Sequence, residues 1–268
     1  MQLHIRHETV YRYDRPVKYS VQRLHLTPRA EPSQRVLAWR IATPGRRLEQ
    51  LDTHGNVVHL LTIEEPHREI CLVVQGTVET GEVDVRQNDG LLSPLAYLAP
   101  TALTAPDGAI RDFARRVGGA EEPSEAMATR LCEAVGDAIR YRSGVSDVGD
   151  SATVAFAAGA GVCQDQSHVF LACARSLGIP ARYVSGYLYT GDSSNVASHA
   201  WVDVWLGCER GWRSLDVTHR RPAVRQYCRL AVGRDYLDAA PVRGVRHGGG
   251  GERMQTTVLV AQSTQQQQ

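Results

Sequence analysis

The stretch GAGVCQDQSHVFLACARSLGIPARYVSGYL, residues 159–188, decides the fold. From Cys163 onward it has a helical period, with one face made of residues three or four positions apart: Gln166, Val169, Phe170, Cys173 and Leu177. Gly178 and Pro180 then follow in the order that ends helices. The pattern therefore predicts a helix whose first residues include Cys163.

This position suits a nucleophilic cysteine. The N-terminus of a helix offers free N–H groups and about half a unit of positive charge, which favour a thiolate over a thiol. Gly159 and Gly161 precede Cys163 and would let a substrate backbone approach closely. Cys173 lies on the apolar face of the same helix, so we interpret it as a core residue. Taken alone, Cys163 is equally compatible with a buried small hydrophobe.

A nucleophilic cysteine needs a base, and the base needs an orienting partner. The segment SHAWVDVWL, residues 198–206, alternates as a strand does. Its aliphatic face is expected to point to the core, and its other face carries His199, Trp201, Asp203 and Trp205. His199 would then face the helix N-terminus or a cleft. Asp216 follows a turn and a short apolar strand, and we expect it to bond the second ring nitrogen of His199.

Each of these residues has a simpler interpretation when taken singly. His199 could be a strand-edge histidine held by backbone groups, and Asp216 could be a turn residue. His168 is a weaker candidate base, because a side chain on the same helix does not easily reach back over its N-terminus. The order of cysteine on a helix, histidine on a strand and aspartate on the next strand favours a catalytic triad of Cys163, His199 and Asp216.

The composition is that of a globular protein. Of the 268 residues, 43% are apolar and 22% charged, and the formal net charge is +1 at pH 7. A chain so close to neutral has no field that would recruit nucleic acid or an anionic membrane, so we expect neither as a partner. No CxxC, HExxH or zinc-type Cys/His cluster occurs, so we expect no metal and no cofactor. The oligomeric state cannot be read from the sequence.

The expected location is the cytoplasm. No stretch approaches the ~20 apolar residues that span a bilayer, and the N-terminus lacks a secretory signal pattern. The six cysteines are widely spaced, which suits reduced thiols in the cytosol.

The pattern of strand-like and helix-like segments along the chain predicts an α+β fold. Residues 1–85 read as short strands separated by turn signals, which indicates a β-rich domain of the antiparallel sandwich or barrel kind. Residues 86–106 form a proline-punctuated connector. Residues 107–262 pass from helices to strands and are predicted to form the catalytic domain. The glutamine-rich end, 263–268, is predicted to be disordered.

Two helices are expected before the cysteine helix. Asp107 is the predicted cap of a helix over 109–117, and Ser124 is the predicted cap of a helix over 125–142.

The cysteine stretch, together with SHAWVDVWL and the WRSLDVT segment around Asp216, resembles the transglutaminase-like superfamily of papain-related folds. The bacterial group of transglutaminase-like enzymes and cysteine proteases is the most similar, and its N-terminal β region resembles residues 12–29 here. The resemblance extends to LAVGRDYLDAAPVRGVRHGGGG near the end of the chain and so covers nearly all of it. It implies a core in which the cysteine helix packs on an antiparallel sheet.

The resemblance also implies roles. Cys163 would be the nucleophile, His199 the general base and acid, and Asp216 the orienting carboxylate. The reaction would be acyl transfer at a glutamine or peptide amide, by hydrolysis or transamidation, on a peptide or protein substrate. A retired enzyme serving as a binding or assembly module is the alternative, although such modules tend to lose triad residues. An arylamine-type acyltransferase is a further one, and the flanking regions argue against it. The acidic calcium loops of animal transglutaminases are not evident.

The sequence departs from the family pattern at two places. The family usually has Asp-Pro-Thr-Asn at the third motif, where this chain has Asp216, Val217, Thr218 and His219. The family often has an aromatic residue where Gln166 stands. Asp165 recurs in the family motif, and at the first turn of the helix we expect it to secure local N–H groups rather than to take part in the chemistry.

Overall fold

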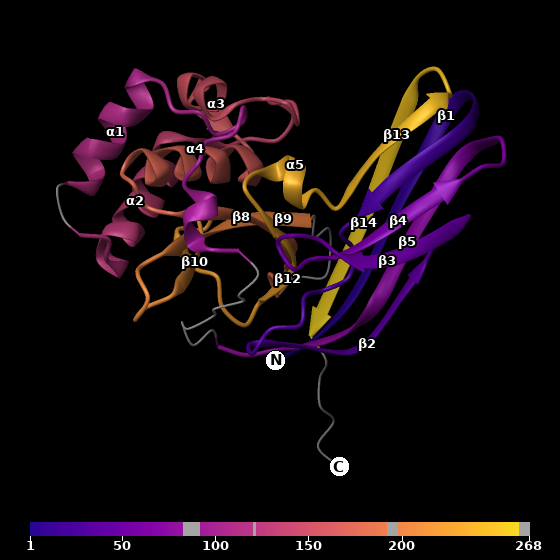
Figure 1. Cartoon of the computed structure of the whole chain (residues 1–268), viewed down its shortest axis with the longest axis horizontal. Helices are drawn as coiled ribbons and strands as arrows, with labels where there is room; N and C mark the ends of the chain where they lie inside the picture. Colours follow the sequence, from indigo (N-terminus) through magenta and orange to yellow (C-terminus); the bar gives the residue numbers. More distant parts are fainter. Residues whose placement is uncertain (83–91, 120–121, 192–197, 263–268) are drawn as a thin grey trace, which may run out of the picture.

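The computed structural model describes residues 1–82, 92–119, 122–191 and 198–262. Two large β-sheets lie side by side, and a group of helices covers one of them (Figure 1). The predicted disordered tail and part of the predicted connector lie outside the described residues. In the described part of the chain, no helix combines the length and apolar character that crossing a bilayer takes.

The helices mostly lie in the middle of the chain. They are the 3-10 helix η1 (Pro94–Tyr97) and the α-helices α1 (Gly108–Gly118), α2 (Glu125–Ala138), α3 (Ala152–Ala158), α4 (Cys163–Ser176) and α5 (Tyr236–Ala239). The predicted caps are confirmed, because Asp107 accepts the N–H of Ile110 and Ser124 accepts that of Met127.

The predicted helix over 125–142 is too long. It ends at Ala138, because the backbone of Ile139 is extended and Arg140–Tyr141 form a short strand, β6. This strand pairs in parallel with β7 (Ala160–Gly161), immediately before the cysteine helix. Pairing with the approach to Cys163 therefore overrides the helical pattern of the sequence.

The smaller sheet carries the helices. It has five strands in the order β11-β10-β9-β8-β12. Their bounds are β8 (Ala181–Leu188), β9 (Ser198–Trp205), β10 (Trp212–Asp216), β11 (Arg221–Pro222) and β12 (Tyr227–Gly233). The aliphatic face of β9 packs against α4, as its alternation predicted. Helix α4 lies between this sheet and helices α1, α2 and α3, so that the position of Cys163 is fixed from several sides.

The larger sheet has seven strands. They are β1 (Gln2–Leu24), β2 (Gln34–Ala42), β3 (Arg46–Leu51), β4 (Val57–Ile63), β5 (His67–Thr80), β13 (Val242–Gly248) and β14 (Glu252–Gln262). The long strand β1 pairs with β5 and β14 along its first half and with β4 and β13 along its second. Its register shifts between Arg12 and Val17, and the sheet curls there around a core that includes Tyr11, Leu24 and Leu61.

The predicted limits of the catalytic domain need correction. Residues 107–262 were expected to form one unit, but β13 and β14 pair with β1 in the larger sheet. Both ends of the chain thus build the same sheet (Figure 1). The strand pattern alone did not reveal this, because it specifies which face of a strand is buried and leaves its pairing partner open.

The two sheets share a buried interface. Leu3, Ile5 and Val260 of the larger sheet pack against Tyr187 and Leu230 of the smaller one. Buried polar groups also cross this interface: the Asn56 side chain bonds both the N–H and the C=O of Val232, at 2.8 and 2.7 Å. Buried polar groups with satisfied partners fix relative position, so the larger sheet holds β8 and β12 in place behind the site.

Candidate active site

Cys163 is the first residue of α4, and its neighbours fix that turn. Asp165 Oδ2 accepts the N–H of Val162 at 2.7 Å and the hydroxyl of Ser146 at 2.6 Å. The expectation that Asp165 secures local N–H groups is therefore confirmed. A Cβ atom on Gly161 would lie 2.6 Å from the Asp165 carboxylate, so only glycine fits there without a shift. Cys163 itself is half-buried.

His199 connects the other two predicted site residues. Its Nε2 lies 2.7 Å from Asp216 Oδ2, which leaves Nδ1 for the Cys163 thiol, the other hydrogen-bond partner of the ring. Burial alone would lower the pKa of His199, but its hydrogen bonds with Asp216 and Cys163 outweigh burial and raise the pKa to about 10. The structure thus brings all three residues together, as the sequence predicted.

Asp216 is fully buried and accepts several hydrogen bonds. Besides His199, its Oδ2 accepts from the Tyr227 hydroxyl at 2.7 Å and from His219 Nδ1 at 2.8 Å. Its Oδ1 accepts the backbone N–H of His219 at 3.1 Å. Burial would raise the pKa of Asp216, but these donors stabilise the carboxylate and hold the pKa well below its usual range. Asp216 is therefore an acceptor-only group that orients the imidazole.

The two departures from the family pattern have structural consequences. His219 takes the place of the family's asparagine and binds Asp216 through both its ring and its backbone. Gln166 takes the place of the family's aromatic residue. Its Oε1 accepts the Thr218 hydroxyl at 2.6 Å and its Nε2 donates to the Ile139 carbonyl at 2.8 Å. Gln166 thereby ties α4 to the loop that follows Asp216.

Two further residues of α4, His168 and Cys173, are buried. His168 is completely buried, its Nε2 accepts the N–H of Tyr236 at 3.2 Å, and burial lowers its pKa to about 3. Cys173 is likewise buried in the core, and burial raises its pKa to about 12. Neither group is placed to act as base or nucleophile.

Asp203 shares a strand face with His199 but binds elsewhere. Its carboxylate pairs with Arg182 at 2.8 Å and with Arg229, and it accepts the Ser214 hydroxyl at 2.6 Å. Burial would raise the pKa of Asp203, but the two guanidinium groups outweigh it and hold the pKa well below its usual range. Asp203 is thus a buried structural anion, and Asp216 is the carboxylate that forms a hydrogen bond with His199.

Tyr227 is a site residue that the sequence did not indicate. It begins the edge strand β12, which β9 and β8 separate from β10, and its ring lies against those of Trp201 and His199. Only the strand order brings it there, so no sequence signal could have found it. His219, in contrast, was visible as a break in the third motif.

A metal could be held by one group of side-chain atoms at this site. Among the described residues, one ligand atom each of His199, Asp216 and His219 lie within 4.8 Å of one another. Two imidazole nitrogens and one carboxylate oxygen suit zinc better than calcium. These atoms already bond to one another at 2.7 and 2.8 Å, so a metal would have to displace two protons.

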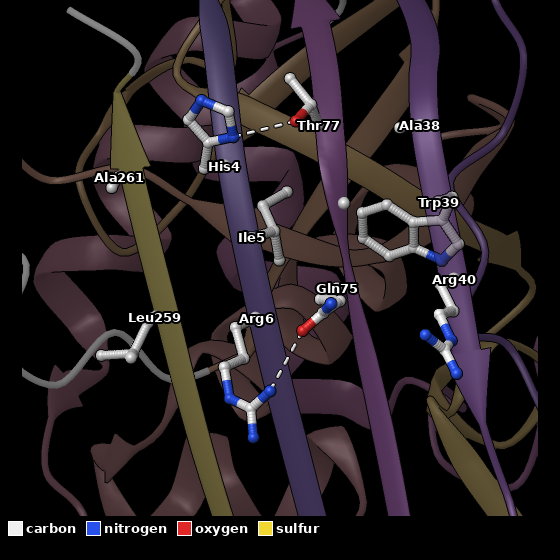
Figure 2. Close-up of a pocket in the computed structure, with 11 residues that line it drawn as sticks. His4, Ile5, Arg6, Ala38, Trp39, Arg40, Gln75, Thr77, Leu259 and Ala261 are labelled. Atoms are coloured by element: carbon white, nitrogen blue, oxygen red, sulfur yellow. Dashed lines mark hydrogen bonds between the residues drawn. The ribbon is translucent and has the colours of Figure 1, made fainter.

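A separate groove of about 540 Å³ lies on the larger sheet, between His4, Arg6, Arg40 and Leu259 (Figure 2). Within it, Arg6 bonds Gln75 at 3.1 Å and His4 bonds Thr77 at 2.9 Å. The residues that line it include no cysteine, aspartate or glutamate, so its Thr77–His4 pair has no carboxylate among them to orient the imidazole. The cysteine, the histidine and the carboxylate that the sequence singled out lie elsewhere, at the start of α4.

Fold and site together define a class of protein. A helix with a half-buried cysteine at its N-terminus packs on an antiparallel sheet that carries a paired histidine and aspartate, which is the transglutaminase-like fold. Residues 3–79 match the bacterial transglutaminase-like N-terminal region, and residues 111–217 match the transglutaminase-like superfamily. The chain belongs to this family, and the predicted fold class is confirmed.

Relatives match along almost the whole chain. An uncharacterized protein of Mycobacterium leprae (strain TN) is 32% identical over 274 residues, which cover 95% of this chain and 96% of the relative. An uncharacterized protein of Mycobacterium tuberculosis (strain H37Rv) is 30% identical over 270 residues, covering 90% and 86%. The crystal structure of "a Putative Cysteine Protease" from Cytophaga hutchinsonii superposes with a TM-score of 0.80 at 21% identity, covering 97% of this chain and 90% of that one. This last likeness concerns the fold.

Proposed function

We propose that this protein is an enzyme that transfers acyl groups from a peptide or glutamine amide through the thiol of Cys163. The observation that carries the proposal is the position of His199, which bonds Asp216 with one ring nitrogen and Cys163 with the other. A cysteine, a base and an orienting carboxylate in this order are what nucleophilic catalysis requires.

The first step is attack on the amide. The Cys163 sulfur forms a bond to the carbonyl carbon, and His199 holds the proton that the thiol gave up. We expect backbone N–H groups at the start of α4, that of Cys163 included, to stabilise the charge that develops on the carbonyl oxygen. The C–N bond then breaks, and His199 donates its proton to the leaving amine. A thioester on Cys163 and a free amine result.

The second step regenerates the enzyme. Water or a second amine attacks the thioester, His199 accepts the proton of the attacking group, and the sulfur leaves as a thiolate. Water gives hydrolysis, whereas an amine gives transamidation. Asp216 stabilises the imidazolium in both steps, and the four hydrogen bonds that it accepts keep it ionised while it does so.

The raised pKa of His199 supports its role as the group that holds the proton in the triad. Against the effect of burial, its hydrogen bonds with Asp216 and Cys163 raise the pKa of the imidazole to about 10, so the ring is protonated at neutral pH. An adjacent imidazolium is the kind of partner that activates a cysteine nucleophile.

Intact-mass spectrometry tests the proposal. After exposure to a peptide library containing glutamine side chains, the wild type should gain the mass of an acyl group on Cys163. Cys163→Ala should gain nothing. Cys208→Ala, which removes an exposed thiol outside the triad, should acylate as the wild type does. Addition of a primary amine to the reaction then shows whether an amide or an acid is released.

A result without acylation would point elsewhere. If Cys163 alkylates with iodoacetamide no faster than Cys208, the thiol is not activated, and the protein is better described as a binding or assembly module of the same fold.

We propose the cytoplasm as its location, and this is supported by the six cysteines, none of which forms a disulfide.

A further inference from the structure

A short segment beside Cys163 exposes apolar side chains. Tyr141 is 57% exposed, Val145 46% and Val148 64%. Exposed apolar residues are common when scattered singly over a surface. Here three occur within eight residues, and the segment that carries them is hydrogen-bonded to residues on either side of Cys163.

The start of this segment is joined to the approach to the nucleophile. Tyr141 pairs with Gly161 in the β6–β7 ladder, and the N–H of Arg142 donates to the Gly161 carbonyl at 2.7 Å. Gly161 is two residues before Cys163 in the chain. Tyr141 is also near enough to Cys163 to interact electrostatically: burial first, and then the charge on Cys163, raises the pKa of its phenol.

The rest of the segment is fastened to the same helical turn. The Ser146 hydroxyl donates to Asp165 at 2.6 Å, and the Gln164 side chain donates to the Val148 carbonyl at 3.0 Å. Gln164 and Asp165 directly follow Cys163 in the sequence. The segment is therefore fastened, near both of its ends, to residues that flank Cys163 in the chain, so its apolar side chains are carried beside the start of α4.

We propose that Tyr141, Val145 and Val148 form an apolar subsite for the side chain next to the amide that Cys163 attacks. The inference rests on the proposed function and specifies it: the substrate is a peptide with an aromatic or aliphatic residue beside the reacting carbonyl. Covering these side chains with an apolar group removes them from water, which favours such substrates over polar ones. Because the subsite is open on one side, the preference is on the order of 10-fold, at the low end for a hydrophobic pocket.

Alkylating reagents test the subsite without a known substrate. Iodoacetamide and N-benzyl iodoacetamide both react by the thiolate displacing iodide, so one C–S bond forms as one C–I bond breaks. Their rates at each cysteine are followed by peptide mapping after brief exposure. The exposed thiol of Cys208 in the same molecule is the reference. The benzyl reagent should be favoured about 10-fold more at Cys163 than at Cys208.

Substitutions identify the side chains that cause the benzyl preference. Tyr141→Ala and Val148→Ser should each lower the benzyl preference, their combination should abolish it, and Tyr141→Phe should retain it. Tyr19→Ala and Val245→Ser remove comparably exposed side chains from the larger sheet, at 43% and 72% exposure, and should leave it unchanged. Circular dichroism confirms that each variant is folded.

Three results would overturn the inference. A benzyl preference equal at Cys163 and Cys208, or one that survives in the double variant, removes the subsite while leaving the proposed function standing. A preference that disappears on dilution of the protein assigns these side chains to a contact with a second copy of the chain. Absence of labelling at Cys163 by either reagent overturns the proposed function itself, and the subsite with it.

Discussion

At the scale of single residues, the site depends on how Asp216 is held. Its Oδ2 accepts from His199, His219 and Tyr227, and its side chain is fully buried. The family pattern at this motif is altered in the chain, and yet the carboxylate keeps its bond to His199. The replacement residue, His219, also supplies donors to Asp216.

Asp216→Asn should weaken catalysis without unfolding the protein. The amide keeps the shape but loses the charge that stabilises the imidazolium. In the serine-protease template a comparable change costs ~10⁴-fold in turnover, and because a Cys–His pair persists without the carboxylate we expect about 10–10³-fold here. The measurement is the rate of Cys163 acylation. Asp112→Asn, an exposed carboxylate on α1, is the control and should react as the wild type does.

The triad also predicts a pH dependence of stability. The pKa of His199 is raised from 6.5 to about 10 on folding, so its contribution to the free energy of unfolding is complete below pH 6.5 and is lost as pH rises towards about 10. The difference in that free energy between wild type and His199→Gln should therefore be larger at pH 6 than at pH 9 in urea titrations. A difference that grows with pH would contradict the assignment.

At the scale of elements, the start of α4 depends on a close approach. The chain arrives through β7, and a Cβ added at Gly161 would lie 2.6 Å from the carboxylate of Asp165, which in turn bonds Val162 and Ser146. The sequence showed the glycines as a flexible approach to Cys163. The structure shows instead that Gly161 is needed because there is no room for a side chain.

Gly161→Ala should therefore destabilise the protein and disturb Cys163. The added Cβ would lie 2.6 Å from the carboxylate, and overpacking of this kind costs about 1–3 kcal/mol. Chemical unfolding measures the loss, and iodoacetamide labelling measures the effect on the thiol. Gly108→Ala is the matched control, because nothing lies within 4 Å of the added atom there and alanine suits a helix. Equal stability of the two variants would show that the turn adapts.

At the scale of the whole molecule, the two sheets depend on each other. Strand β14 pairs with β1 from Leu3–Gln262 to Tyr13–Glu252, and its Val258 and Val260 are buried against the smaller sheet. A catalytic domain cut at the predicted limits would retain β13 and β14 but lose the strand with which they pair.

A fragment of residues 107–262 should consequently fail to fold cooperatively. It exposes the buried faces of β12 and β14, which include Leu230 and Val260, and it leaves an unpaired edge prone to aggregation. Urea unfolding followed by circular dichroism should show a broad transition or none, whereas the full chain should give a single sharp one. A sharp transition for the fragment would restore the predicted domain limits.

The sequence by itself determined the local features of this protein. The helix that begins at Cys163, the caps at Asp107 and Ser124 and the aliphatic face of the strand after His199 follow from short-range periodicity and capping chemistry, which each segment carries on its own. The three candidate site residues were also predicted from the sequence, because the motif of the family fixes their order along the chain.

Only the tertiary structure decided which distant segments meet. The pairing of the last strand with the first, the reach of Tyr227 across the sheet to Asp216 and the early end of α2 at Ala138 all depend on contacts between residues far apart in the chain. Strand alternation specifies a buried face but no partner, and helix propensity yields where pairing and burial stabilise another conformation. These choices arise from the free energy of the whole fold, and no single segment contains them.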